Sequence, residues 1–346
     1  METFSGVQLD NQIEKKFITY LVGKRALRPS TADCYVRQVR IFEKRYPALD
    51  RVRNEDVVNY LADMKLKSSK NANTRRLMKI ALETFYNWYA PIVGIANPTK
   101  DLGRIKRYIS HPKLIHPDEL ERMLHAVDHQ DDCDWSRRTC AILALLADTG
   151  IRAQEFVRIK AGDVQLNYNK SKNTAHFELT VAAIKGTHSR LIPFSNLIEG
   201  SLAEYFCRYY LWAIVEKNLK TTQPLFFKLG NKFNSYQEDM NIPLRQGGLQ
   251  FCINRAAFET GIDRRISPHQ FRHFYGTYSI INGMDIWTLK YLMGHANIIT
   301  TQSYIHLADQ TSGKTLEHSP TFNIKSTIQN KGYTNIVNEL ARKINQ

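Results

Sequence analysis

A proline-rich basic segment interrupts the chain about one third of the way along its length. The segment, ANPTKDLGRIKRYISHPKLIHPDEL, covers residues 96–120 and contains three prolines, so no regular helix or strand can continue through it. A chain of 346 residues is also too long for one ordinary compact domain and suits two. We therefore predict a helical domain over residues 1–106, a linker over 107–116, a second domain over 117–310 and a tail over 311–346.

Positive charge is concentrated in the part of the chain that ends in this segment. Residues 1–113 contain 22 basic and 11 acidic side chains. The whole chain carries 48 Lys plus Arg, 33 Asp plus Glu and a formal net charge of +15. A basic domain followed by a nearly neutral one predicts a polyanionic partner, and nucleic acid is favoured over a membrane surface.

The sequence argues against several other classes of protein. No apolar run approaches the roughly 20 residues that span a bilayer, and the N-terminus lacks the apolar core of a signal peptide. The five cysteines are odd in number and scattered, which fits neither a disulfide framework nor a zinc site. We therefore expect a cytoplasmic protein without a structural metal. The cysteines are Cys34, Cys133, Cys140, Cys207 and Cys252.

Two amphipathic helices are predicted in the basic region, one starting at Pro29 and one within residues 73–89. Their apolar faces are Tyr35, Val39, Phe42 and Tyr46 in the first helix, and Leu77, Ala81, Thr84 and Trp88 in the second. A basic helix face is often merely solvated, but two such faces in a basic region favour contact with nucleic-acid phosphates. The predicted contacts are Arg37, Arg40 and Lys44 in the first helix, and Arg75 and Lys79 in the second.

The second domain is predicted to be mostly helical with one small antiparallel sheet, which makes the fold mainly α. The helix that contains CAILALLADTG ends at Gly150 as its C-cap. Residues 176–184 alternate in polarity and are rich in β-branched side chains, and residues 190–194 return as a second strand after the turn KGTHS. Helical patterns resume from about residue 199.

Four short segments of the second domain carry ionisable side chains in a fixed order. They are TGIRAQE with Arg152 and Glu155, IKGTHSRLIP with Lys185 and Arg190, SPHQFRHFYGT with His269 and Arg272, and LMGHANIITTQSY with His295 and Tyr304. His269 and Arg272 lie one turn apart on a helix that Ser267 can cap and Pro268 can begin. Each segment taken alone has an ordinary structural explanation, such as a helix cap, a surface turn or a core tyrosine.

Taken together, the four segments resemble the motifs of the tyrosine recombinase, or phage integrase, family, which includes Xer recombinases, phage integrases and transposon recombinases. The resemblance covers residues 10–310 and is strongest over residues 140–307. The matching positions are Thr149, Gly150, Arg152 and Glu155 for TGxRxxE, Lys185, Gly186, Arg190 and Pro193 for KGxxxRxxP, His269, Phe271, Arg272 and His273 for HxLRH, and Met293, Gly294, His295 and Tyr304 for the last motif.

The resemblance implies a SAM-like core-binding domain followed by a catalytic domain that needs no metal or other cofactor. It implies that double-stranded DNA is the substrate and that the chain is a homo-oligomer, a dimer on one site and a tetramer in the synapse. The implied nucleophile is Tyr304, which forms a 3′-phosphotyrosine. The other implied roles are phosphate binding by Arg152, Arg272 and His295, proton transfer by Lys185 and His269, orientation by Glu155, and DNA contact by Arg190.

Two questions stay open at the level of sequence. Residues 334–345 place Ile336, Val337, Leu340 and Ile344 on one stripe, so a tail helix either packs on its own domain or is donated to a neighbouring protomer. The function also has two rivals, a type IB topoisomerase and a catalytically silent DNA-binding protein on the same fold. The complete set of six catalytic positions argues against the silent protein, and the paired first and last motifs favour recombination.

Overall fold

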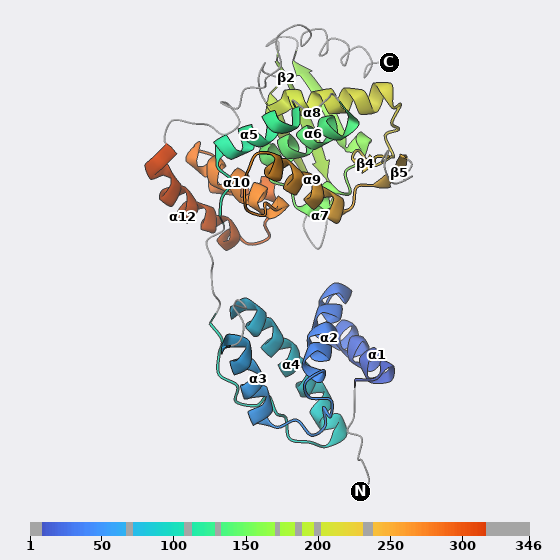
Figure 1. The fold of residues 1–346 in the computed structure, drawn as a ribbon, viewed down its shortest axis with the longest axis vertical. Helices are drawn as coiled ribbons and strands as arrows, with labels where there is room; N and C mark the ends of the chain where they lie inside the picture. The colour runs from blue at the N-terminus through green and yellow to red at the C-terminus, as the bar shows by residue number, and fades with distance from the viewer. Residues whose placement is uncertain are drawn as a thin grey trace. The chain divides into compact units, whose positions relative to one another are not determined.

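The computed structural model describes residues 9–66, 72–106, 113–128, 133–169, 174–183, 189–196, 202–230 and 238–315 (Figure 1). The chain forms two compact units, residues 1–110 and residues 111–346. Each unit buries its own hydrophobic core. The predicted linker, residues 107–116, is described only from residue 113 onward.

The first unit is a bundle of helices around an aromatic core. Phe17 meets Phe85 edge to face with ring centroids 5.2 Å apart, and Phe85 stacks on Tyr89 at 5.0 Å. Aromatic rings bury a large apolar area, and they stabilise a small bundle in which few side chains can be fully enclosed. The elements are α1 (Asn11–Thr19), the π-helical turn η1 (Tyr20–Lys24), α2 (Pro29–Glu43), α3 (Asn54–Leu66) and α4 (Ala72–Val93).

The two helices predicted in this unit exist, with corrections to their faces. Helix α2 begins at Pro29 as predicted but ends at Glu43, and Tyr46 stacks on Phe42 from beyond the helix end, with ring centroids 4.9 Å apart. In α4 the buried stripe is shifted by about one residue from the predicted one, because its neighbours cover a different face. The fully buried positions of α4 are Met78, Ala81, Leu82, Phe85, Tyr86, Tyr89 and Ala90.

The second unit is mostly helical and contains a small antiparallel sheet, as predicted. Its first part consists of α5 (Pro117–Asp128), α6 (Asp134–Thr149), α7 (Ala153–Phe156), the 3₁₀ turn η2 (Ala161–Asp163), β1 (Val164–Asn169), β2 (Thr174–Val181) and β3 (Arg190–Asn196). Its second part consists of α8 (Leu202–Leu211), the π-helical turn η3 (Trp212–Glu216), β4 (Phe227–Lys228), β5 (Asp239–Pro243), α9 (Gln246–Glu259), α10 (Pro268–Ile281), α11 (Ile286–Met293) and α12 (Ile298–Thr315).

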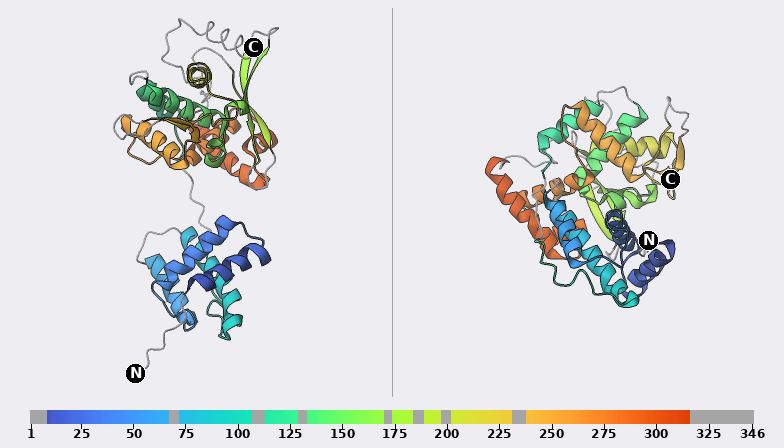
Figure 2. Two further views of the ribbon diagram at one scale, coloured as in Figure 1. Left: turned by 90° about the vertical axis from the view of Figure 1, so that its right-hand side faces the viewer. Right: turned by 60° about the horizontal axis from the view of Figure 1, so that its bottom comes forward.

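The three-stranded sheet has the order β1-β2-β3, and the left view of Figure 2 shows it along one side of this unit. The predicted hairpin is present, with Phe177 opposite Phe194 and Val181 opposite Arg190. Strand β1 was not predicted, although its sequence VQLNYN alternates apolar and polar residues as a strand does. Because alternate residues of a strand face the same side, Arg190 shares the buried face of β3 with Ile192 and Phe194.

Helix α6 runs through the core of the second unit, which explains its almost continuous apolar sequence. Cys140 to Ala147 are all buried, with α5 and α8 packed against the helix. The helix ends at Gly150, whose φ of +56° is the left-handed C-cap conformation that the sequence predicts. Helix α10 also contacts α6, so the first and third motifs start from neighbouring helices. Among the described helices, none is both long and apolar enough to cross a bilayer.

Candidate active site

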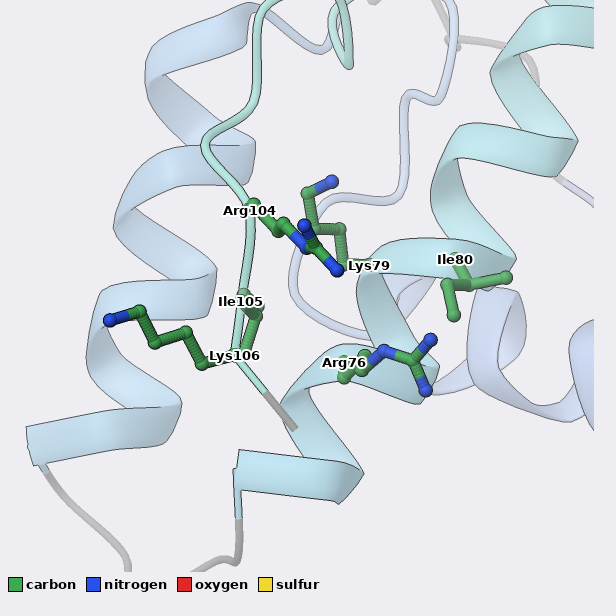
Figure 3. Close-up of a pocket in the computed structure, with 6 residues that line it drawn as sticks. All are labelled: Arg76, Lys79, Ile80, Arg104, Ile105 and Lys106. Atoms are coloured by element: carbon green, nitrogen blue, oxygen red, sulfur yellow. The ribbon is translucent and has the colours of Figure 1, made fainter. Parts of the chain in front are cut away.

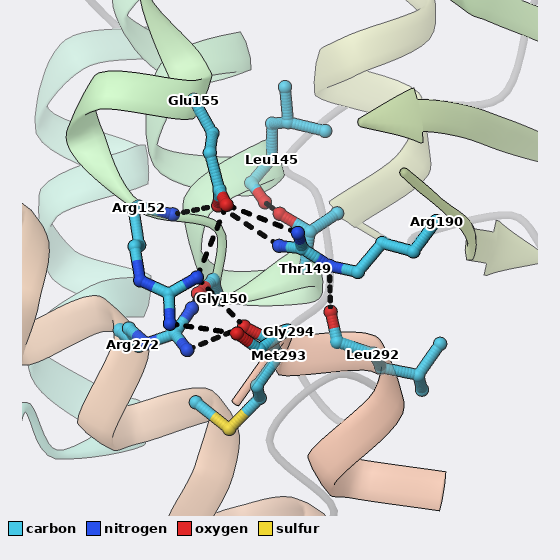
Figure 4. A network of polar contacts seen from close by, with 10 residues as sticks. All are labelled: Leu145, Thr149, Gly150, Arg152, Glu155, Arg190, Arg272, Leu292, Met293 and Gly294. Atoms are coloured by element: carbon cyan, nitrogen blue, oxygen red, sulfur yellow. Dashed lines mark hydrogen bonds and ion pairs between the residues drawn. The ribbon is translucent and has the colours of Figure 1, made fainter. Parts of the chain in front are cut away.

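The C-terminal end of α11 is the point at which two of the predicted catalytic arginines meet (Figure 4). Arg152 donates from Nη2 to the Gly294 carbonyl at 3.0 Å and from Nη1 to the Met293 carbonyl at 3.3 Å. Arg272 donates from Nη2 to the same Met293 carbonyl at 2.6 Å and from Nη1 to the Gly150 carbonyl at 2.8 Å. Arg152 and Arg272, more than 100 positions apart in the sequence, thus both donate to the Met293 carbonyl.

Glu155 contacts Arg152 with both oxygens of its carboxylate. Its Oε2 accepts the Arg152 backbone N–H at 2.8 Å, and its Oε1 lies 3.2 Å from Arg152 Nη1. Burial alone would raise the pKa of this carboxyl, but hydrogen bonds from Arg190 and from the Arg152 backbone outweigh it and lower the pKa. Glu155 therefore stays ionised inside the site.

Arg190 is not a surface residue, which corrects the prediction that it contacts DNA. Only 4% of the residue is exposed, because it points into the core from the first position of β3. Its guanidinium binds Glu155 with both Nη atoms, at 3.1 and 2.9 Å, and its Nε donates to the Leu292 carbonyl at 2.7 Å. Each nitrogen of the Arg190 guanidinium therefore donates to an acceptor inside the protein.

Tyr304 lies on α12 with its ring against the third motif. The residue is 2% exposed, and its ring packs on Gly276 of α10, where an added Cβ would come within 2.9 Å of three ring carbons. The Arg272 side chain lies close enough to Tyr304 to affect the pKa of its hydroxyl. Burial raises the pKa of Tyr304, while the positive charges of Arg272 and Arg152 act in the opposite direction.

His295 is held by a partner that the sequence analysis did not single out. Its Nδ1 lies 2.9 Å from Oγ1 of Thr301, a fully buried residue one turn before Tyr304 on α12. The His295 and Tyr304 rings are stacked with centroids 6.0 Å apart. Burial and the neighbouring charges of Arg272, Arg152 and Arg190 lower the pKa of His295 to about 3, so the ring is neutral at physiological pH.

The two histidines of the third motif lie on the same face of α10. Their rings are 4.4 Å apart, and the ring of His273 meets Tyr304 edge to face at 5.6 Å. His269 is exposed at the rim. Partial desolvation lowers its pKa, and the charges of Arg272 and Arg152 lower it further. Burial lowers the pKa of His273 to about 4, and its Nδ1 is buried without a hydrogen-bond partner among the described residues.

The predicted phosphate contacts of the first unit differ in how accessible they are. Arg37, Arg40 and Lys44 are exposed on α2, although Arg40 pairs with Glu14, with its Nε 2.7 Å from Glu14 Oε2. Arg75 and Lys79 are only partly exposed, and Lys79 pairs with Glu83 at 2.6 Å.

Lys79 also lines a groove of about 580 Å³ that contains four cations (Figure 3). We call this feature the basic groove. It is lined by Arg76, Lys79, Ile80, Arg104, Ile105 and Lys106. Arg76 was not predicted as a phosphate contact, and Arg104 and Lys106 belong to the predicted linker's N-terminal flank. The groove brings these separate basic positions onto one surface.

Some predictions concern residues outside the described ranges, and others concern metal sites and disulfides. Lys185 and Gly186 lie in the β2–β3 connection, and the tail helix of residues 334–345 lies beyond α12; neither is among the described residues. Within the described ranges, no group of three or more His, Cys, Asp or Glu side chains is placed to hold a metal ion. All five cysteines are described, and each is a free thiol.

Comparison with known proteins identifies the family and the fold. Residues 113–311, more than half of the chain, match the phage integrase family, and residues 15–90 match the N-terminal SAM-like domain of phage integrases. The chain belongs to the phage integrase family. The prediction of a tyrosine recombinase with a helical N-terminal domain and a mostly helical second domain is therefore confirmed at the level of family and fold.

Two curated relatives of this recombinase show the extent of the similarity. It is 26% identical over 318 residues to tyrosine recombinase XerC of Listeria innocua serovar 6a, covering 90% of this chain and 98% of that protein. It is 27% identical over 305 residues to tyrosine recombinase XerC of Staphylococcus epidermidis, covering 87% and 94% of the two chains.

Solved structures share the recombinase fold. One is a lambda integrase dimer bound to a COC′ core site, with a TM-score of 0.60 and 15% identity, covering 92% of this chain and 80% of that one. Another is the Tn1549 transposon integrase in complex with transposon right end DNA, with a TM-score of 0.57 and 17% identity, covering 88% and 99%.

Two residues of the recombinase site were missed or misread in the sequence, although a signal for each exists. Thr301 stands three residues before Tyr304, a spacing that places both on one side of a helix. Arg190 alternates with Ile192 and Phe194, and that two-residue period places it on the inner face of its strand. In both cases the periodicity of the element was the informative pattern.

Proposed function

We propose that this tyrosine recombinase cuts and rejoins double-stranded DNA at specific sites through a covalent 3′-phosphotyrosine. The Tyr304 oxygen attacks the scissile phosphorus, the bond to the 5′-oxygen breaks, and that oxygen takes up a proton. In the reverse step a 5′-hydroxyl attacks the phosphotyrosine, the new phosphodiester forms, and the tyrosine leaves. Because the covalent intermediate retains the energy of the broken bond, the reaction needs no cofactor.

The observation that carries this proposal is the position of both arginines next to one tyrosine. Both arginines lie close enough for their charges to act on the pKa of the Tyr304 hydroxyl, and Arg152 shares the Met293 carbonyl with Arg272. The transition state places negative charge on the non-bridging oxygens, and a guanidinium can bind two such oxygens through its planar fork. Charge held in place before the reaction starts is usually the largest single contribution to such catalysis.

The two histidines of the proposal have different surroundings, and these support different roles. His295 is buried, neutral and fixed by Thr301, which suits a hydrogen-bond donor to a phosphate oxygen. His269 is exposed at the rim, where it can accept the tyrosine proton and return it. Lys185 stays the predicted general acid for the leaving 5′-oxygen, a prediction that rests on its motif alone.

The basic groove supports a contact with the DNA backbone in the first unit. Arg76, Arg104 and Lys106 are exposed there beside the partly buried Lys79. Cations gathered in one concave surface suit a chain of phosphates, because each contact releases counterions from the DNA. The exposed side chains of Arg37 and Lys44 on α2 remain further candidates.

Two features of the assembly belong to the same proposal. We infer a dimer on one DNA site and a tetramer when two sites are joined. The structurally similar lambda integrase, described as a dimer on its core site, supports this inference. The tail stripe of Ile336, Val337, Leu340 and Ile344 is the proposed contact between protomers, in preference to packing on its own domain.

The free thiols of all five cysteines support the proposed location in the reducing cytoplasm.

The central test is the trapping of a covalent adduct. Duplexes enriched by this protein from a random-sequence pool, each nicked so that a short 5′-hydroxyl fragment can diffuse away, should give a denaturant-resistant protein–DNA adduct. Tyr304→Phe should give none, while Tyr291→Phe, at a 56% exposed tyrosine on α11, should retain it. An adduct with Tyr304→Phe would refute the assigned nucleophile. Adduct formation that EDTA abolishes and Mg²⁺ restores would refute the metal-free mechanism.

A second experiment separates recombination from its rivals. A supercoiled plasmid that carries two copies of the enriched site should give recombinant circles, and a plasmid without the site should stay supercoiled. A type IB topoisomerase would relax both plasmids and would not exchange strands. A silent DNA-binding protein would bind the site but would form neither an adduct nor a recombinant product.

A further inference from the structure

Arg190 and Glu155 form a buried ion pair beside Arg152, one of the two arginines proposed to bind the phosphate. The side chains are 2% and 1% exposed, and the guanidinium binds the carboxylate with both Nη atoms. A buried carboxylate with one partner removed is strongly destabilising, so Glu155 requires a cation beside it. The pair is the deepest charged contact in the site shown in Figure 4.

Glu155 has a second cation within reach, and that cation is Arg152. Arg152 Nη1 lies 3.2 Å from Glu155 Oε1, yet its side chain is 37% exposed and its Nη atoms also bond to the end of α11. Arg190 contacts both carboxylate oxygens at shorter distances, 2.9 and 3.1 Å. Arg190 therefore compensates most of the carboxylate charge, and the Arg152 side chain stays partly exposed, at 37%.

We propose that Arg190 is a positioning residue that serves as the counter-ion of Glu155, so that the charge of Arg152 remains available to the scissile phosphate. This inference rests on the proposed function. Without Arg190, the buried carboxylate would have only Arg152 for compensation, and the two would form a closed bidentate pair. The charge that stabilises the transition state would then be neutralised before the DNA bound.

A second contact extends the role of Arg190 to the last motif. Its Nε bonds to the Leu292 carbonyl at the end of α11. Its guanidinium lies so close to the next turn that a Cβ on Gly294 would come to 2.7 Å from Nη1 and 2.8 Å from Cζ. His295 follows Gly294 directly, so the same guanidinium packs against the backbone that carries His295. One side chain of β3 thus contacts both Glu155 and the segment of the last motif.

The experiment is a rescue cycle with the variants Arg190→Met, Glu155→Gln and their combination. The substrate is the nicked duplex enriched by the wild-type protein, and the readouts are the dissociation constant and the single-turnover rate of adduct formation. Arg190→Met should slow adduct formation by about 100-fold, the scale of losing one preorganised donor. The dissociation constant should change far less, because the phosphate contacts of the first unit are intact.

The combined variant decides the mechanism of the effect. It removes both charges of the pair, so Arg152 is no longer drawn to a carboxylate, and the rate should recover by about 10-fold over Arg190→Met, a coupling typical of directly interacting residues. Arg190→Lys keeps the charge and loses the fork, so its rate should fall between wild type and Arg190→Met. A combined variant no faster than Arg190→Met would overturn the counter-ion role, as would a wild-type rate in Arg190→Met.

A matched control separates positioning from stability. Arg138→Met also removes a buried arginine of the second unit, one that donates to the Phe227 carbonyl at 2.9 Å and belongs to none of the four motifs. At temperatures where thermal unfolding shows every variant folded, Arg138→Met should keep the wild-type rate. An equal loss in Arg138→Met would overturn the inference. If the wild-type protein itself forms no adduct, the proposed function fails, whatever the variants show.

Discussion

The imidazole of His295 and the hydroxyl of Thr301 are joined by a buried contact of 2.9 Å between Nδ1 and Oγ1. Because the ring is neutral, it carries one N–H, and the nitrogen that carries it depends on what the other nitrogen binds. A hydroxyl that donates to Nδ1 places the hydrogen on Nε2. The Nε2–H is then the group that can donate to a phosphate oxygen, so Thr301 selects the useful tautomer.

The first prediction concerns Thr301 directly. Thr301→Val keeps the shape of the side chain and removes the hydroxyl, so the rate of adduct formation should fall by about 10-fold, the scale of one hydrogen bond that orients a reacting group. Thr301→Ser should retain most of the rate. The control is Thr300→Val at the exposed neighbouring position, which should behave like wild type. Equal rates for the two valine variants would contradict the assignment.

The second prediction is a pH dependence of stability that originates in His295. The folded pKa is about 3, below the ordinary value of about 6.5, so the unfolded chain binds a proton in this window and the folded chain does not. This contribution to stability is present above pH 6.5 and is lost as the pH falls toward 3.

Urea unfolding at several pH values measures this effect. Between pH 6.5 and pH 5 the wild-type protein should lose roughly 1 kcal/mol more than His295→Asn, which has no such proton to bind. His116→Asn, at an exposed histidine before α5, should keep the wild-type slope. A wild-type slope in His295→Asn would show that this ring does not titrate as the burial implies.

The third prediction tests the close approach of Gly294 and Arg190. Gly294 has a φ of +63° and no room for a Cβ, whereas Gly261 has a φ of +71° and nothing within 4 Å. Gly261→Ala should cost about 1 kcal/mol of unfolding free energy from backbone strain alone. Gly294→Ala should cost about 1–3 kcal/mol more, because the guanidinium must move as well. Equal costs in chemical denaturation would contradict the close approach of the Arg190 guanidinium to Gly294.

The fourth prediction concerns the basic groove. Arg104→Gln and Lys106→Gln should each weaken binding to duplex DNA of any sequence, and each should lower the slope of log K against log salt concentration by about 0.9. Fluorescence anisotropy over a salt series measures both quantities. Lys65→Gln, at an exposed lysine of α3 outside the groove, is the charge-matched control and should leave the slope unchanged. Similar slopes for all three variants would remove the groove from the DNA contact.

Sequence patterns predicted most of the fold because they depend on local rules. Pro29, Gly150 and Pro268 begin or end their helices as predicted, since each fixes or permits a backbone conformation that the helix end requires. Strand β1 was missed although its residues alternate in polarity, because six residues give a short pattern and pairing with β2 completes the strand.

The residues of the candidate site could be predicted from the sequence, but the hydrogen bonds that connect them could not. The spacing of the motifs shows which side chains belong together, while hydrogen bonds to the carbonyls of Met293 and Gly294 depend on how α11 lies against α7 and α10. The misplacement of Arg190 has the same origin. A basic side chain is usually exposed, and only its pairing with Glu155 makes burial favourable.

The shared carbonyls at the end of α11 have a consequence for the order of events on DNA. Arg152 and Arg272 already hold their positions in the protein alone, because Met293 and Gly294 accept their hydrogen bonds. The rotamer entropy of these long side chains, up to about 2 kcal/mol each, is therefore lost during folding and not during the encounter. The Tyr304 side chain, in contrast, must still become accessible to DNA, since it is 2% exposed. The two arginines are therefore in place before DNA binds, whereas attack by Tyr304 requires a change in its surroundings on α12.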